Sequence, residues 1–282
     1  MTAFLLLLLA IGIAPLAVGT LLLKPASSGG RLSSQTGSIL LCALAFNLTF
    51  FWQELWLVIP KVLTPGLHPV LYHNDHGWTG HAPTVELLQG TGALATLCAG
   101  LAFSAVLGIV RAPSPTWRRF LFWMAFQGLF QSLTQLAIGT VLPGNDMGRA
   151  LGYLQAGPVI KAALLGLDVL AMAAVGGFLA RVGRPDPIDR TRGFAYELLA
   201  TALLSTALTI PFREPRDIVE VVLVPLFVNL VGAGWLAFGA VLVPADAALR
   251  AQAGAIRIIG PSVALAATLL LFQIVLRPGI AF

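Results

Sequence analysis

Runs of about twenty apolar residues recur along the whole chain, and this pattern decides its fold class. Of the 282 residues, 57% are hydrophobic and only 10% are charged, whereas a soluble domain carries about 25% charged residues. The runs do not alternate between polar and apolar residues, so they are typical of helices rather than of barrel strands. A helix also satisfies its own backbone hydrogen bonds within a bilayer. The sequence therefore predicts an all-α, polytopic integral membrane protein with a single membrane domain over residues 1–282.

Eight segments are expected to span the membrane. They are Ala3–Leu23, Ser38–Pro60, Thr84–Val110, Trp117–Leu142, Ala150–Ala180, Phe194–Phe212, Asp217–Val243 and Ala255–Leu276. The fifth is long and contains Gly157-Pro158, so a bent or interfacial turn is expected near its start. The connections after the first, third, fifth and seventh spans hold eleven lysines and arginines, and the opposite connections hold five. Because positively charged loops stay in the cytoplasm, we expect a multi-pass protein of a bacterial inner membrane with both termini outside the cytoplasm.

The two halves of the chain resemble each other in the same order through all four spans. The matched pairs are Ala17–Lys24 with Ala174–Arg181, Leu57–Pro60 with Leu208–Pro211, Val85–Glu86 with Val219–Glu220, Leu101–Leu107 with Leu236–Leu242, and Val141–Gly144 with Val275–Gly279. A four-helix unit begins and ends on one side of the membrane, so its copy has the same orientation. The pattern predicts internal repeats over residues 1–149 and 150–282, related by an axis along the membrane normal.

The first repeat contains an insertion of 17 residues that the second repeat lacks, within a predicted external loop at 61–83. This loop holds all four histidines of the chain together with an aspartate: His68, His73, Asp75, His76 and His81. Imidazole nitrogens and carboxylate oxygens are ligands of zinc, copper and iron, so these five residues form a candidate site for a divalent metal. Their spacing matches no strong metal motif. The alternatives are a structural loop whose histidines bond backbone carbonyls, and a pH-sensing loop without metal.

Glu54 is the candidate catalytic base. It lies near the outer end of the second span, directly before the histidine loop, and ionisable residues at membrane depth are costly enough to indicate function. Such a carboxylate can act as a metal ligand, a general base or a proton acceptor. The alternative is a structural carboxylate that bonds a neighbouring helix.

Further polar residues lie inside the predicted spans and define a candidate intramembrane path. Gln127, Gln131 and Gln135 recur every four residues and therefore share one face of the fourth span. Lys161 and Asp168 lie two turns apart on the fifth span and are expected to pair. The stripe of glutamines either lines a path or supplies hydrogen bonds between helices.

The positions of the histidines and of the positive charges argue against a haem protein and against a nucleic-acid-binding protein. No histidine lies in a predicted span, so we expect no haem held between two histidines. The calculated isoelectric point is about 9.8, but the cations lie mostly at the ends of apolar segments, so we expect membrane lipid rather than nucleic acid as the partner. Small residues such as Gly176 and Gly232 favour close helix packing, and thus a compact bundle.

Three classes of function remain open. The first is a membrane enzyme, with or without a metal, whose extracytoplasmic site is formed by the histidine loop and Glu54. The second is a transporter or channel that uses the intramembrane polar path. The third is a non-catalytic subunit of a larger membrane complex. Homo-oligomers and membrane-complex partners are compatible with each of them.

Overall fold

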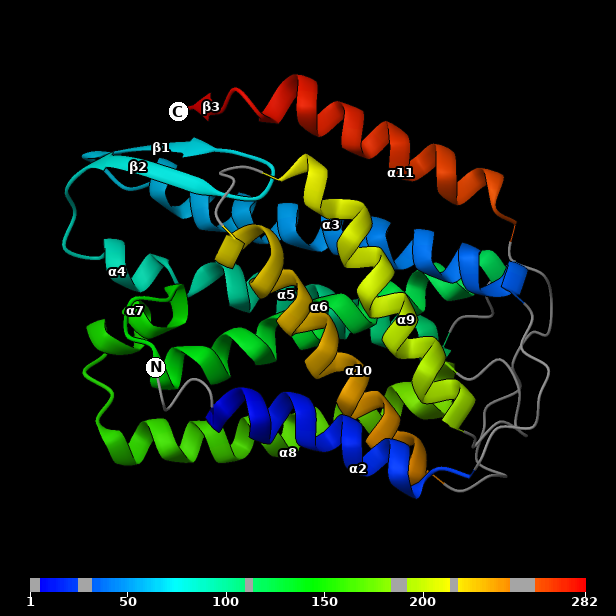
Figure 1. The fold of residues 1–282 in the computed structure, drawn as a ribbon. Coiled ribbons are helices and arrows are strands. Elements are labelled where there is room, and N and C mark those ends of the chain that lie inside the picture. The colour runs from blue at the N-terminus through cyan, green and yellow to red at the C-terminus, as the bar shows by residue number, and fades with distance from the viewer. Residues whose placement is uncertain (1–5, 25–31, 110–113, 184–191, 214–217, 244–256) are drawn as a thin grey trace.

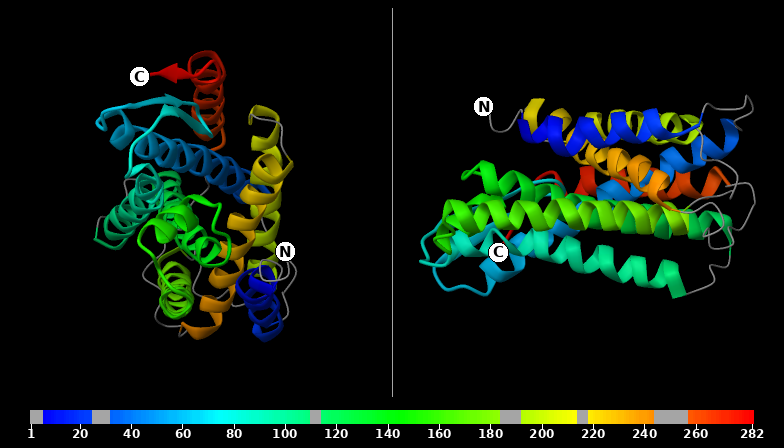
Figure 2. Two further views of the ribbon diagram at one scale, coloured as in Figure 1. Left: turned by 90° about the vertical axis from the view of Figure 1, so that its left-hand side faces the viewer. Right: turned by 90° about the horizontal axis from the view of Figure 1, so that it is seen from below.

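The computed structural model of the chain describes residues 6–24, 32–109, 114–183, 192–213, 218–243 and 257–282. Long helices make up most of these residues and run roughly along one common direction (Figures 1 and 2). The helices are η1 (Leu8–Ile13), α2 (Ala14–Leu22), α3 (Leu32–Val62), α4 (Val85–Leu88), α5 (Thr91–Ile109), α6 (Pro115–Val141), α7 (Asp146–Tyr153), α8 (Pro158–Gly183), α9 (Arg192–Thr209), η2 (Ile210–Phe212), η3 (Val219–Leu223), α10 (Val224–Leu242), α11 (Ile259–Leu271) and η5 (Phe272–Leu276).

The expected class of a helical membrane protein is supported by length and composition. Among the described residues, six helices are long and apolar enough to cross a membrane. They are Gln35–Val62, Val85–Ile109, Pro158–Val182, Phe194–Phe212, Val221–Leu242 and Ile259–Leu276. The expected ends at Ala3, Val110, Asp217 and Ala255 lie outside the described residues.

Helix α6 occupies the centre of the bundle (Figure 1) and packs against α3, α5, α7, α8 and α10. All its residues from Phe122 to Gln135 are buried. A helix that is buried on every side needs no outward polar face. Its glutamines therefore point at other helices, and they lower its hydropathy below that of the six membrane-length helices.

Glycines allow the helices to approach closely, as the small residues predicted. A Cβ atom at Gly176 would lie 2.2 Å from the backbone oxygen of Trp235, and one at Gly100 would lie 2.6 Å from the backbone nitrogen of Leu129. At Gly232 the nearest atom would be a ring carbon of Phe126 at 2.4 Å. These contacts bring α8 against α10, α5 against α6, and α10 against α6.

The segment 61–83, expected to be an external loop, contains a β-hairpin. Strand β1 (Leu67–Leu71) pairs antiparallel with β2 (His76–Gly80), and the chain ends in β3 (Ile280–Ala281), which pairs with the other edge of β1. Gly80 has a positive φ of 90°, and a Cβ atom there would lie 1.9 Å from the carbonyl oxygen of Gly66. The hairpin lies across one end of the helix bundle (Figure 1).

The fifth predicted span divides at the expected place. Helix α7 ends at Tyr153, and α8 begins at Pro158, directly after Gly157. Proline fixes φ and lacks an N–H group, so it suits the first turn of a helix. The break turns α7 into a short helix at the same end of the bundle as the hairpin (Figure 1).

The packing of the helices does not show the proposed two-fold relation. Helix α5 packs extensively against α6, whereas α11 packs against α3 and makes no comparable contact with α10, its expected equivalent partner, within the described residues. The internal duplication therefore stays a prediction from the sequence.

Candidate functional site

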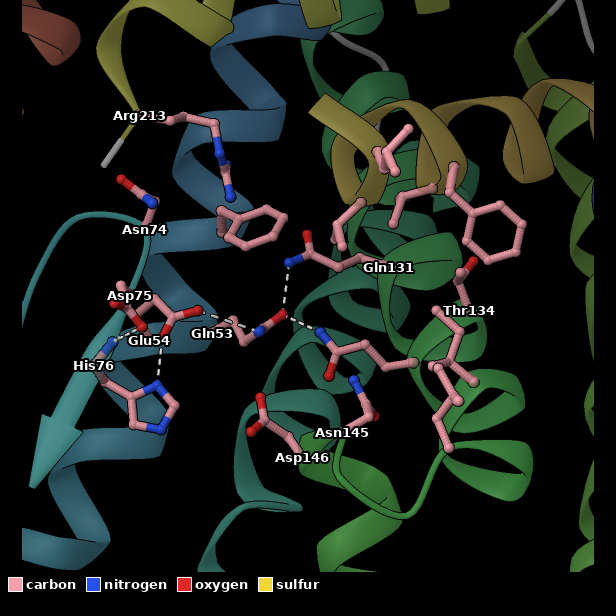
Figure 3. A pocket seen from close by; sticks show the side chains of 18 residues that line it. Gln53, Glu54, Asn74, Asp75, His76, Gln131, Thr134, Asn145, Asp146 and Arg213 are labelled. Atoms are coloured by element: carbon pink, nitrogen blue, oxygen red, sulfur yellow. Dashed lines mark hydrogen bonds and ion pairs between the residues drawn. The ribbon is translucent and has the colours of Figure 1, made fainter. Parts of the chain in front are cut away.

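A cavity of about 670 Å³ lies between the hairpin turn, α3, α6, the start of α7 and the start of α10. Its polar lining consists of Gln53, Glu54, Asn74, Asp75, His76, Gln131, Thr134, Gln135, Asn145, Asp146 and Arg213. Its apolar lining consists of Phe50, Ile138, Leu142, Leu223, Val224, Phe227 and Val228. Figure 3 shows Glu54, Asp75 and His76 on one side, Gln131 and Thr134 of α6 on the other, and Asp146 apart from both groups. The lining thus combines polar and apolar side chains, and α6 contributes both kinds, for example Gln131 and Ile138.

Glu54 and His76 form a buried pair at the wall of the cavity. The Nδ1 atom of His76 lies 2.7 Å from the Oε2 atom of Glu54, and both side chains are nearly inaccessible to solvent. The other ring nitrogen of His76, Nε2, lies 3.0 Å from the Oε1 atom of Gln89. The ring also stacks on Trp78, which follows two residues later on the same face of β2. Two side chains and an aromatic face therefore fix the imidazole.

These contacts imply that the pair holds one proton between Nδ1 and Oε2. The Oε1 atom of Gln89 is an acceptor, so Nε2 of His76 must be the donor. The remaining bond to Glu54 then needs one proton, which resides on either the imidazole or the carboxyl group. Burial lowers the pKa of His76, but the hydrogen bond and the charge of Glu54 outweigh it, so the pKa is raised. The raised pKa thus favours the protonated form of the His76 imidazole beside Glu54.

Gln53 connects this pair to the central helix. Its Oε1 atom accepts hydrogen bonds from Gln131, at 2.6 Å, and from Gln135. Its Nε2 atom donates to the Oε1 atom of Glu54 at 3.2 Å. The result is a continuous chain of buried hydrogen bonds from α6 through α3 to the hairpin (Figure 3).

The predicted glutamine stripe thus supplies hydrogen bonds between helices. Gln127 donates to the Oδ1 atom of Asn229 on α10 at 2.8 Å, and Asn229 in turn donates to Thr206 on α9 at 3.0 Å. Gln131 and Gln135 reach α3 instead. Of the three glutamines, these last two also line the cavity.

Two further acids face the cavity from loops. Asp75 ends the hairpin turn and accepts a hydrogen bond from the backbone N–H of His76 at 2.8 Å. Asp146 opens α7, directly after the N-cap residue Asn145. Burial raises the pKa of Asp75, and it raises the pKa of Asp146 to about 6. Asp146 was not predicted as a site residue, since its only local signal in the sequence is its place in an Asn-Asp helix start.

Lys61 closes the network on the far side of Gln89. Its ammonium group donates to the backbone oxygen of Leu57 at 2.7 Å and to the Oε1 atom of Gln89 at 3.4 Å. It also lies 4.9 Å from the centre of the Trp78 ring. Lys61 was counted among the loop cations that predict the orientation in the membrane. It is fully buried, so it also contributes to the packing of this site.

The other histidines do not join His76. The Nε2 atom of His73 lies 2.8 Å from the backbone oxygen of Phe212, and the ring packs against Phe272. His68 pairs with Thr79 in the hairpin register, which places it on the opposite face from His76. His81 follows β2 at the other end of the hairpin, and it is exposed, as is His68.

The geometry does not support the predicted metal centre. Among the residues that the structure describes, no three histidine, cysteine, aspartate or glutamate side chains are grouped so that they could hold a metal ion. The reason lies in the hairpin, since its register and length separate His68 and His81 from His76. Both ring nitrogens of His76 are, in addition, already engaged by Glu54 and Gln89. A bound zinc, copper or iron ion stays a prediction.

Asp168 lies deep in α8, but the expected pair with Lys161 does not form among the described residues. Asp168 is buried, and neither of its carboxylate oxygens has a hydrogen-bond partner in the described part of the chain. Lys161 is partly exposed one helical turn after the start of α8. Two turns of helix separate the residues by about 10 Å along the axis. The carboxyl group of Asp168 is thus isolated from the cavity described above, whose lining does not include it.

Comparison with known protein families, with curated proteins and with solved structures found no match to this chain.

Proposed function

We propose that this chain is a multi-pass membrane protein that binds a small amphipathic molecule in the cavity and exchanges a proton with its polar head. The observation that carries the proposal is the Glu54–His76 pair, which holds one proton at the wall of a cavity that is also lined by seven apolar side chains. A volume of about 670 Å³ lies within the usual range for small-molecule sites, which combine apolar walls with a few placed polar groups.

The site has two acid–base groups on different walls. The first is the Glu54–His76 pair on α3 and the hairpin, and the second is Asp146 at the start of α7 (Figure 3). General acid–base catalysis works best when the pKa of the group lies near the ambient pH, and the pKa of Asp146 is about 6. A proton that leaves the substrate on one side can thus be replaced from the other side. This arrangement favours an enzyme that moves protons on a membrane-borne substrate.

We propose that the chain crosses the membrane eight times, with the hairpin and both termini outside the cytoplasm of a bacterial cell. Helix α6 has 27 residues, about 40 Å at 1.5 Å per residue, which exceeds a hydrocarbon core of about 30 Å. It falls short of the other spans only in hydropathy, and its burial in the bundle accounts for that. The segment Leu9–Leu22 is apolar and short, and it packs along α10 as a further crossing.

The isolated carboxyl group of Asp168 supports a second candidate, proton-coupled transport. A buried carboxyl group without a partner is costly in its charged form, so it is poised to take up and release a proton. In this alternative, the cavity is the outward-facing substrate site and Asp168 carries the coupled proton. The tight glycine contacts between α8 and α10 and between α5 and α6 argue against an open channel.

The enzyme proposal is tested by conversion of lipids. Wild-type protein in nanodiscs is incubated with a total membrane-lipid extract from a bacterium, and the products are identified by mass spectrometry. We expect a change in at least one lipid species with the wild type, and its loss in Glu54→Gln and His76→Phe. Glu86→Gln is the matched control, because Glu86 is a half-exposed carboxylate outside the cavity. Equal conversion by Glu54→Gln and the wild type would overturn the proposal.

Transport is tested separately in proteoliposomes that contain a pH-sensitive dye. Addition of the same extract to the outside is expected to acidify the lumen with the wild type and not with Asp168→Asn. If Asp168→Asn acidifies the lumen at the wild-type rate, Asp168 is not the coupled proton site.

A further inference from the structure

The α6 side of the cavity presents hydrogen-bonding oxygen atoms that the protein itself leaves unused, and these atoms point to a ligand class. The Oε1 atoms of Gln131 and Gln135 and the hydroxyl oxygen of Thr134 have no hydrogen-bond partner within the described part of the chain. All three residues are at least nine-tenths buried and line the cavity along α6. The amide donors of both glutamines are already used on Gln53.

The charges of the lining point in the same direction. Three carboxyl groups line the cavity, those of Glu54, Asp75 and Asp146, and one arginine and one histidine oppose them. His76 balances Glu54 in the pair described above. Arg213 lies with its guanidinium 4.3 Å from the ring centre of Phe50, at the far end of the cavity from Asp146 (Figure 3). Asp146 is the remaining carboxyl group; among the described residues it forms no ion pair within 4.0 Å, and Lys61 and Arg149 act on it from a greater distance.

An uncompensated buried acceptor costs free energy, which a ligand with matching donors recovers. A primary ammonium group supplies three N–H donors and one positive charge. Neutral hydroxyl groups would supply donors without the charge, and a carboxylate or phosphate alone would add further acceptors beside these oxygen atoms. The apolar side chains of Ile138, Leu142 and Phe227 suit a hydrocarbon body attached to that head.

We propose that the cavity binds a primary amine with an apolar body, its ammonium group between Asp146 and the α6 residues Gln131 and Thr134. The proposal rests on the function proposed above, because it names the polar head with which the site exchanges a proton. Both a free long-chain amine and the ethanolamine head of a phospholipid have this chemistry.

The test uses ligands with one hydrocarbon body and different heads. Wild-type protein in phosphatidylcholine nanodiscs is titrated at pH 7 with decylamine, decanol, decanoate and decyltrimethylammonium, and binding is followed by tryptophan fluorescence and calorimetry. Decyltrimethylammonium has the charge without N–H donors, and decanol has a donor without the charge. We expect decylamine to bind at least about tenfold more tightly than each of the others, since a hydrogen bond to a charged group contributes about 1.5–3 kcal/mol. Equal binding of decylamine and decanoate would overturn the proposal.

Variants locate the head group. We expect Asp146→Asn to weaken decylamine binding about tenfold and Thr134→Val to weaken it about threefold, as a lost charged and a lost neutral partner would. The matched controls are Glu86→Gln and Thr96→Val, since neither residue lines the cavity, and both should bind decylamine as the wild type does. If Asp146→Asn and Glu86→Gln bind decylamine equally well, the assigned position of the ammonium group is wrong.

Two further arms separate the sources of the amine and the two proposals. If dihexanoyl phosphatidylethanolamine competes with decylamine and dihexanoyl phosphatidylcholine does not, the ligand is a lipid with an ethanolamine head. If neither lipid competes, the ligand is a free amine. Selective decylamine binding together with no lipid conversion by the wild type would retain the ligand class and overturn the acid–base function. Lipid conversion that depends on Glu54, without selective binding of decylamine, would retain the acid–base function and overturn the proposed ligand class.

Discussion

The hydrogen bond between Glu54 and His76 should be one of the strongest pairwise interactions in the molecule. The two atoms are 2.7 Å apart, and only 5% and 8% of the two side chains are exposed. Removal of one member of a buried pair typically costs about 3–5 kcal/mol, because the other member is left in a low-dielectric environment. We expect Glu54→Gln and His76→Phe each to lower the free energy of unfolding by about 3 kcal/mol. Phenylalanine retains the ring that stacks on Trp78.

The double variant decides whether the pair acts as a unit. Once one partner is absent, removal of the second costs little, so the double variant should be less destabilised than the sum of the single variants. We expect a coupling free energy of about 2–4 kcal/mol. The measurement is unfolding by SDS in mixed micelles at pH 6, where His76 is protonated, followed by tryptophan fluorescence.

The ion pair between Glu86 and Arg149 is the matched control. Its charged atoms are 3.8 Å apart, and the side chains are 45% and 39% exposed. Pairs of this kind typically contribute at most about 1 kcal/mol. The same cycle with Glu86→Gln and Arg149→Gln should therefore give a coupling below about 1 kcal/mol. Additive effects within about 0.5 kcal/mol at Glu54 and His76 would refute the shared-proton pair.

Three more predictions follow from single features. The pKa of Asp146 is raised in the folded state to about 6, so this residue destabilises the fold increasingly as pH rises from about 4 to 6. Asp146→Asn should thus be more stable than the wild type at pH 7.5, by at most about 3 kcal/mol, and equally stable below pH 4. Thermal unfolding of both proteins at the two pH values measures this, and equal stability at both would contradict it. Gly176→Ala should destabilise the protein by about 1–3 kcal/mol, because the new Cβ atom would meet the backbone of Trp235. Gly177→Ala is the control: its Cβ atom would meet no atom within 4 Å, so the stability in SDS unfolding should be unchanged or higher. Similar effects of the two substitutions would disprove the close contact. Metal analysis should find the same zinc, copper and iron content in the wild type and in His76→Phe, since both ring nitrogens of His76 already have partners. A metal that is stoichiometric in the wild type and absent from the variant would show instead that His76 is a metal ligand.

The helical membrane class and the positions of the helices could be predicted because they depend on local hydropathy. Runs of apolar residues, capping residues and prolines act over a few turns, and so the break before Pro158 could also be expected. The face of α6 that carries Gln131 could be predicted from helical periodicity alone. Its partner could not, since Gln53 is 78 residues away in the chain and no local pattern selects it.

The candidate site was predicted in part, and the errors have one physical origin. Glu54 and His76 were both singled out, and they meet. His68 was grouped with them because it is near in sequence, but strand pairing places it on the opposite face of the hairpin. Asp146 was missed because it reaches the cavity only when α7 folds back beside the hairpin. Proximity in sequence is a poor guide where an antiparallel ladder reverses the chain.

The glutamines of α6 show how one stripe of residues can serve both the fold and a site. Their N–H groups are spent on interhelical bonds, to Gln53 and to Asn229, and these bonds hold α3 and α10 against the central helix. Their carbonyl oxygens are left over, unpartnered within the described residues. A leucine stripe would pack the same helices without that cost. At Gln131 and Gln135 those oxygens belong to the cavity wall, where a ligand with N–H donors could bond them. At Gln127, which lies outside the cavity, the same reasoning predicts no effect on ligand binding.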